Sequence, residues 1–171
     1  MDLRRFFDRA IRASFHDLAL PGDPAAPYLG DLLTRFVRIE NLFPRGTSVP
    51  RLETVVDMML EAQGAWDVDS PDFRPEHEVS VRRHIGDYTL FMTGIFPERV
   101  ERTSATSFYI SQGKQAYRFV SEHARSRARD ATTPYRRLAE RFESYASVLD
   151  YTRRVHFFDA PTHPFFRLLF D

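Results

Sequence analysis

The residues best suited to chemistry lie in the segment HIGDYTLFMTGIFP, residues 84–97. His84 and Asp87 are three positions apart, so in a helix their side chains share one face. A carboxylate placed there orients an imidazole, which then moves a proton or binds a ligand. We therefore regard His84 and Asp87 as a candidate catalytic dyad. The alternative is that Asp87 belongs to a buried ion pair that fixes the register of the helices.

Further polar side chains near this dyad indicate a pocket. Asp87 is the only charged residue in 85–96, so this helix is apolar all round and we expect it at the centre of the fold. A buried carboxylate needs a cation or several hydrogen-bond donors. We expect the pocket between this helix and the next one, and its candidate residues are Arg83, Tyr88, Tyr109, Lys114, Tyr117 and Arg118.

Small residues predict close packing in the same region. Gly86 and Gly94 lie near one face of the helix. Glycine inside a helix costs about 1 kcal/mol relative to alanine. That cost is offset if a second helix packs against the missing side chains, and Gly113 and Ala116 indicate that the next helix is the partner.

Two motifs of this region resemble a known group of proteins. They are GDYTLFMTGIFP, from Gly86 to Pro97, and YISQGKQAY, from Tyr109 to Tyr117. The group consists of uncharacterised bacterial helical proteins that carry G-D-x-x-L-F-x-x-G-x-F-P followed by Y-x-x-x-G-x-x-A-Y. The likeness covers residues 84 to 120 and has no established activity attached to it. It therefore implies a shared fold and no function.

Several chemistries are disfavoured by the sequence. The chain has no cysteine, which excludes disulfides, thiolate catalysis and zinc fingers. No Glu-x-x-His pair of a di-iron bundle, no G-x-S-x-G and no nucleotide-binding fingerprint is present. His16-Asp17 is expected to be an exposed pair, and Glu76-His77-Glu78 a solvated first turn of a helix. We accordingly expect no metal and no cofactor.

The charge pattern bears on nucleic-acid binding. The chain has 24 basic and 24 acidic residues, a balance that does not favour nucleic acid as the main partner. Residues 118–141 carry seven arginines against three acidic residues. Such a patch binds phosphates, but no helix-turn-helix or RNA-binding module accompanies it. Nucleic-acid association through 118–141 is therefore our third and weakest reading.

The apolar spacing that must position these residues is helical almost throughout. It predicts helices over 2–19, 27–40, 48–64, 75–96, 104–127 and 133–152, with a short aromatic helix near the C-terminus. Residues 65–74, which include Trp66, form the one long linker. No alternating strand pattern is present. The sequence therefore predicts an all-α, single-domain bundle of about six main helices over residues 1–171.

The chain also bears on location and assembly. Its 171 residues contain no 18-residue apolar run, so we expect no membrane insertion. The charged start, MDLRRFFDRA, lacks the apolar core of a signal peptide, and we expect a cytoplasmic protein. The tail HPFFRLLFD, residues 163–171, is too short to be a stable helix alone. It either closes the core or docks on a second copy, and we favour a homodimer.

These observations favour one function and leave two alternatives. The leading hypothesis is a non-enzymatic module that binds a protein partner or a small apolar ligand, since the chain has 16 Phe and 7 Tyr. The second is an enzyme that uses the His84–Asp87 dyad. The third is the nucleic-acid-associated protein described above.

Overall fold

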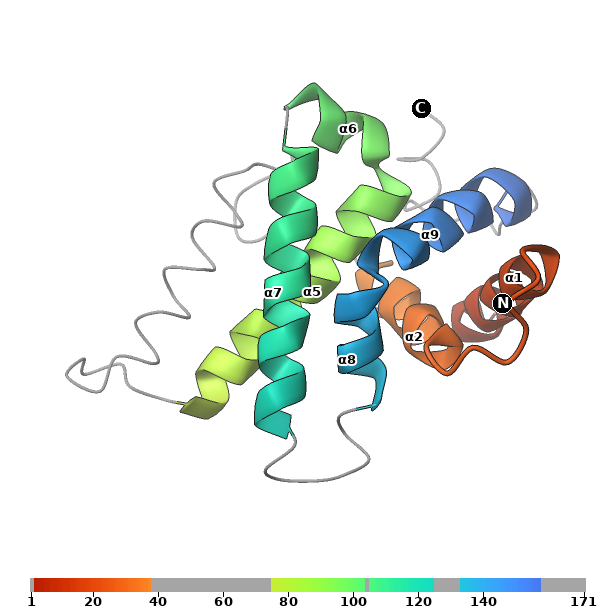
Figure 1. The fold of residues 1–171 in the computed structure, drawn as a ribbon. Coiled ribbons are helices and arrows are strands. Elements are labelled where there is room, and N and C mark those ends of the chain that lie inside the picture. Colours follow the sequence, from red (N-terminus) through yellow and green to blue (C-terminus); the bar gives the residue numbers. More distant parts are fainter. Residues whose placement is uncertain (1, 38–74, 104, 125–132, 158–171) are drawn as a thin grey trace.

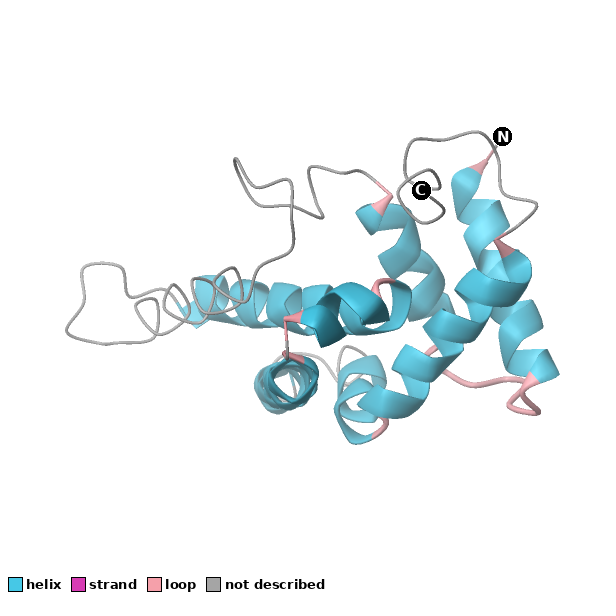
Figure 2. Cartoon of the chain, turned by 90° about the horizontal axis from the view of Figure 1, so that it is seen from above, coloured by secondary structure: helices cyan, strands magenta, loops and turns pink. Residues whose placement is uncertain are grey.

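The described part of the chain is built from helices. The computed structural model describes residues 2–37, 75–103, 105–124 and 133–157. These residues form seven helices and no strand (Figures 1 and 2), with the bounds α1 Leu3–Asp17, α2 Ala26–Phe36, α5 Pro75–Ile95, α6 Pro97–Arg102, α7 Thr106–Ala124, α8 Thr133–Glu140 and α9 Phe142–His156. The all-α prediction is confirmed. The predicted helix over 48–64, Trp66 in its linker and the C-terminal tail lie outside the described residues.

The four helices that sequence periodicity placed best are α1, α2, α5 and α7. The predicted apolar stripes of α1 and α2 are buried at Phe7, Ile11, Leu29 and Leu33. Leu18, which the prediction placed on the first stripe, follows the end of α1 and is exposed. Asp2 caps α1, because its carboxylate accepts the backbone N–H groups of two following residues. Periodicity therefore located these helices to within a few residues at each end.

Two breaks differ from the prediction. Pro97 stops α5 as expected, but it also opens α6, where proline at the first position leaves no N–H unsatisfied. The predicted helix over 133–152 is two helices, because Arg141 leaves helical geometry with φ −120° and ψ 31°. Phe142 follows the break and is fully buried. No glycine or proline marks this break, so the sequence pattern gave no sign of it.

The centre of the bundle is α5, as predicted. It contacts α2, α6, α7 and α9 (Figure 1). Eleven of the twelve residues in 85–96 are buried, and Thr93 is half-buried. Neighbouring helices cover α5 on several sides. Its apolar side chains are therefore shielded from water in every direction, as an apolar helix requires.

Glycines set how closely the helices approach α5. A Cβ atom on Gly86 would lie 2.6 Å from Cε1 of Tyr117 on α7. Gly113 of α7 leaves room for Thr89 and Phe142 in the same way. Gly94, however, faces α9: its Cβ would lie 2.6 Å from Cβ of Leu149. The predicted α5–α7 contact is therefore correct at Gly86 and Gly113, and the prediction for Gly94 is wrong.

Buried polar contacts join the outer helices. Ser14 of α1 and Thr152 of α9 share a hydrogen bond of 2.6 Å between their hydroxyl oxygens. In the loop after α1, Asp23 accepts a hydrogen bond of 3.0 Å from the Tyr145 hydroxyl of α9. Burial, together with this carboxylate, raises the pKa of Tyr145 to about 12. None of the described helices is long and apolar enough to cross a bilayer.

Candidate functional site

Asp87 lies at the centre of a buried hydrogen-bond network. Its side chain is 1% exposed, as the sequence predicted. Oδ1 accepts hydrogen bonds from the hydroxyls of Tyr28, at 2.6 Å, and Tyr117, at 2.7 Å. Oδ2 accepts one from Nη1 of Arg35 at 3.0 Å. The carboxylate thus joins α2, α5 and α7 at one point.

The network also changes the acidity of its members. Burial and the adjacent Asp87 carboxylate raise the pKa of Tyr28 and Tyr117, so both hydroxyls remain protonated donors. Burial lowers the pKa of Arg35, but the attraction of Asp87 and Tyr28 and the hydrogen bonds to Asp87 and Asp31 together outweigh burial, so the pKa is raised overall. The network is therefore a stable arrangement of one anion, one cation and two neutral donors.

A hollow opens beside this network, between α2 and α5. Its volume is about 260 Å³, and we call it the α2–α5 hollow; it is lined by Arg35, Ser80, Val81, Arg83, His84 and Asp87. These residues come from successive turns of α5 and from the last turn of α2. The hollow therefore collects the two candidate dyad residues and the candidate Arg83.

Donors predominate in the α2–α5 hollow. Arg35 lies between two carboxylates, since its Nε also donates to Asp31 at 2.9 Å. Arg83 is exposed and makes no ion pair with another described residue. The His84 ring stacks on Phe36, with ring centroids 5.8 Å apart and planes at 16°. Among the side chains that line the hollow, two arginines, Arg35 and Arg83, stand against one carboxylate, Asp87, so this lining carries a net positive charge.

The other candidate residues are not among those that line the hollow. Tyr88 and Tyr109 are both buried, with ring centroids 6.2 Å apart. Lys114 forms an ion pair with Glu143 of α9. Tyr117 lies beneath Asp87, and Arg118 lines a different hollow between α7 and α8. The structure thus brings Arg83, His84, Asp87 and Tyr117 together. The Tyr88 ring lies beside this group, with its centroid 6.4 Å from that of His84, whereas Lys114 and Arg118 are engaged elsewhere.

The hollow around His84 and Asp87 is not where the sequence placed it. We expected it between the helices now defined as α5 and α7. There, however, the Tyr117 ring fills the space over Gly86, and Phe142 and Thr89 fill the space over Gly113. The hollow is on the opposite side, toward α2. Close packing at the glycines, which the sequence did predict, leaves no room for a pocket between α5 and α7.

Sequence reasoning missed the two residues of α2 that bind Asp87. Tyr28 and Arg35 are seven positions apart, so they lie on one face of α2 after two turns. This spacing, at the edge of the apolar stripe, was a usable signal. What the sequence does not contain is the pairing of α2 with α5.

Two smaller predictions have different outcomes. His16 and Asp17 are exposed, as expected, and Asp17 accepts a hydrogen bond of 2.9 Å from the Tyr151 hydroxyl. The prediction of a solvated first turn is wrong at Glu78, which is 1% exposed. Arg82, one turn later, approaches its Oε1 at 3.2 Å. Because burial outweighs this cation, the pKa of Glu78 is raised.

The described residues bring together no group of three histidine, aspartate or glutamate side chains that could bind a metal ion. Comparison with known proteins does not assign the site: no family model, no curated protein and no solved structure matches the chain. The resemblance of residues 84–120 to uncharacterised bacterial proteins therefore stays a prediction.

Proposed function

We propose that this protein is a non-enzymatic module that binds a small anionic ligand in the α2–α5 hollow. One observation carries the proposal. Within the described part of the chain, the hollow combines Arg83, which has no acidic partner there, with one lining carboxylate, Asp87, which is already compensated. Guanidinium groups bind oxyanions through paired, charge-assisted hydrogen bonds. The ligand that suits this hollow best is a compound with a phosphate group.

Binding is favoured over catalysis by the state of Asp87. Three donors already occupy its two oxygens. A carboxylate that orients a catalytic imidazole must use an oxygen for that contact. The hydrogen bonds of Asp87 instead run to Tyr28, Tyr117 and Arg35. Asp87 thus supports the floor of the site, while Arg83 and His84 face the ligand.

The proposal is tested by calorimetric titration with inorganic phosphate. The wild-type protein is compared with Arg83→Gln, which removes the unpaired charge, and with the control Arg12→Gln, an exposed arginine on α1. Loss of a charge-assisted hydrogen bond costs about 1.5–3 kcal/mol. We therefore expect Arg83→Gln to weaken binding about tenfold or more, and Arg12→Gln to leave it unchanged.

The result that would contradict the proposal is equally definite. If the wild type shows no saturable heat with phosphate, or if both variants bind as the wild type does, the hollow is not an anion site. Acetate, titrated in parallel, distinguishes a requirement for phosphate from a general affinity for carboxylates.

A further inference from the structure

The outer face of α1 carries a row of basic side chains. Arg5, Arg9, Arg12 and His16 follow one another at intervals of three or four positions, so they share one face of the helix. We call this face the α1 stripe, and all four of its residues are exposed. The buried residues of α1 occupy the other side of the helix, where α1 contacts α2 and α9 (Figure 1). The stripe therefore faces solvent.

Acidic side chains compensate the stripe very little within the described part of the chain. Arg9 and Arg12 form no ion pair with another described residue. Arg5 approaches the carboxylate of Asp2 at 3.6 Å, but both side chains are more than half exposed, and such a pair contributes little. Asp8, one turn before Arg12, lies against the backbone of α2 instead. The charge of the stripe is thus left open to a partner.

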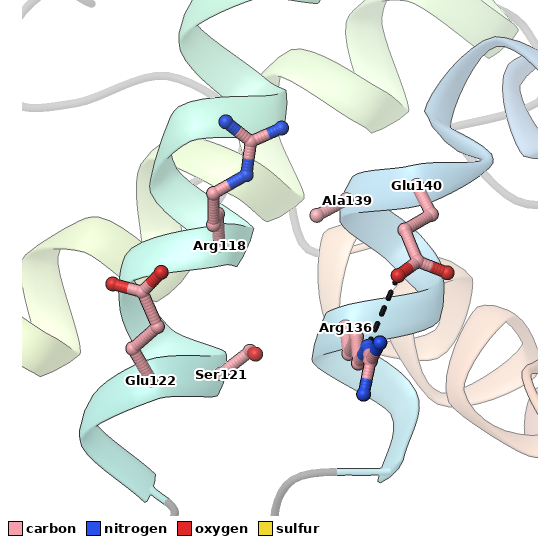
Figure 3. A pocket seen from close by; sticks show the side chains of 6 residues that line it. All are labelled: Arg118, Ser121, Glu122, Arg136, Ala139 and Glu140. Carbon is pink, nitrogen blue, oxygen red and sulfur yellow. Dashed lines mark hydrogen bonds and ion pairs between the residues drawn. The ribbon is translucent and has the colours of Figure 1, made fainter.

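This arrangement is unfavourable within the helix itself. Like charges one turn apart repel each other, and this applies both to Arg5 with Arg9 and to Arg9 with Arg12. The first turn of α1 also contains no acidic residue, although the helix dipole favours one there. On α8, by contrast, the exposed Arg136 donates to Glu140, one turn away, at 3.0 Å (Figure 3). An anion from outside the chain would compensate the α1 stripe in the same way.

We infer that the α1 stripe binds the phosphate backbone of double-stranded DNA without reading its sequence. Guanidinium groups bind phosphates through paired, charge-assisted hydrogen bonds. A helix rises about 1.5 Å per residue, so Arg5, Arg9 and Arg12 are about 6 Å and about 4.5 Å apart along its axis. Each strand of a duplex carries one phosphate per about 3.4 Å. Each of the three arginines can therefore contact a phosphate of its own.

The composition of the stripe favours this partner over other polyanions. The stripe contains no large apolar side chain, whereas the centre of a protein interface is apolar. It contains no Phe, Tyr or Trp, on which the bases of a single strand would stack. The apolar face of α1 is buried in the bundle, so it is not available to insert into a membrane surface. What the stripe offers is a row of charges alone, which suits the regular charges of a duplex.

The stripe is independent of the α2–α5 hollow, because the two share no residue. Inorganic phosphate contacts one exposed arginine at a time, which contributes little, whereas a duplex contacts several at once and releases counterions. The chain is neutral overall, with 24 basic and 24 acidic residues. The attraction therefore acts only over about 8 Å at physiological salt. Binding to DNA should accordingly be weak and fall steeply with salt.

The test is fluorescence anisotropy of a labelled DNA duplex of mixed sequence, titrated with the full chain at several salt concentrations. With three arginines on phosphates, the logarithm of affinity should fall against that of salt with a slope of about −2.7, or about fortyfold from about 50 to about 200 mM. Arg9→Gln and Arg12→Gln should each reduce this slope by about one. The exposed Arg102 of α6 supplies the matched control, Arg102→Gln, which should bind as the wild type does, and so should Arg83→Gln.

Arg9→Gln and Arg12→Gln relieve repulsion along α1, so both should melt at or above the wild-type temperature, and a loss of binding would not reflect unfolding. The inference is overturned if the anisotropy does not change at about 50 mM salt, or if Arg102→Gln loses as much affinity as Arg9→Gln. It is also overturned if phosphatidylserine vesicles or poly-glutamate bind through these arginines more tightly than the duplex does. The partner would then be a membrane or an acidic protein.

Discussion

At the scale of single residues, Asp87 connects the sequence to the fold and to the site. Its burial followed from its position in an apolar helix, and the need for a cation or several donors followed from burial. Its partners did not follow, because Tyr28 and Arg35 are 59 and 52 positions away along the chain. Sequence spacing predicts which residues are neighbours within one helix. The contacts of Asp87 with Tyr28 and Arg35 depend on the packing of α2 on α5, which sequence spacing does not predict.

The network predicts a large effect of Asp87→Ala. The change leaves the buried Tyr117 hydroxyl and the Arg35 guanidinium without their shared acceptor. Removing one partner of a buried charge pair costs about 3–5 kcal/mol, and we expect the lower end, since Arg35 keeps Asp31. The matched control is Asp31→Ala, which removes a carboxylate from the same arginine at a half-exposed position and should cost about 0–1 kcal/mol. Urea unfolding of both variants measures this, and equal losses would contradict the network.

Glu78 predicts a dependence of stability on pH. Its pKa is raised in the folded protein, mainly by burial, so the fold favours the protonated form. The stability that this form contributes is present at acidic pH and is lost as pH rises from the ordinary value of Glu through the raised one. Glu78→Gln mimics the protonated form.

We therefore expect Glu78→Gln to raise the melting temperature at pH 7, and the gain over the wild type to shrink by pH 4. The exposed Glu101 of α6 provides the control variant, Glu101→Gln, which should show no such trend. A Glu78→Gln protein that melts below the wild type at pH 7 would show that the pair with Arg82 outweighs desolvation.

At the scale of elements, the periodic spacing of apolar residues predicted the helices. It could not predict a break that has no periodic signal. Apolar spacing located α1, α2, α5 and α7. The break at Arg141 arises where the backbone turns and a buried aromatic residue, Phe142, lies against Gly113. No local propensity encodes that contact. Gly94 is a second example. The sequence shows that this residue is small, but it does not show that α9 is the helix that packs against it.

The α5–α7 contact makes a prediction about Gly86. Gly86→Ala gains about 1 kcal/mol of helix propensity. The added carbon would lie 2.6 Å from a Tyr117 ring that is fully buried, and overpacking costs about 1–3 kcal/mol. We expect a net loss of unfolding free energy, and a larger one for Gly86→Leu.

The matched control for Gly86→Ala is Gly30→Ala in α2. There the added carbon meets the carboxylate of Asp8, the far end of a flexible side chain that can swing away. Denaturant unfolding should give the lower midpoint to Gly86→Ala. If Gly86→Ala is as stable as the wild type, the α5–α7 contact is looser than described.

At the scale of the whole molecule, the aromatic tail predicts an assembly. Residues 163–171 lie outside the described residues, so the prediction rests on composition alone: five of the six residues 165–170 are apolar. We expect the full chain to form a homodimer. We expect a variant that lacks residues 164–171 to be a folded monomer. Sedimentation velocity distinguishes the two. A wild-type chain that sediments as a monomer at high micromolar concentration would leave the tail closing its own core.

The central claim is that the α2–α5 hollow binds a small anion, and one measurement tests it most directly. ¹⁵N-labelled protein is titrated with inorganic phosphate and followed by two-dimensional NMR. We predict saturable shifts that are largest at the amides of Ser80, Arg83 and His84, three of the α5 residues that line the hollow, and that are lost in Arg83→Gln. Shifts that never saturate, or that spread over the exposed arginines of α1 and α6, would contradict the claim.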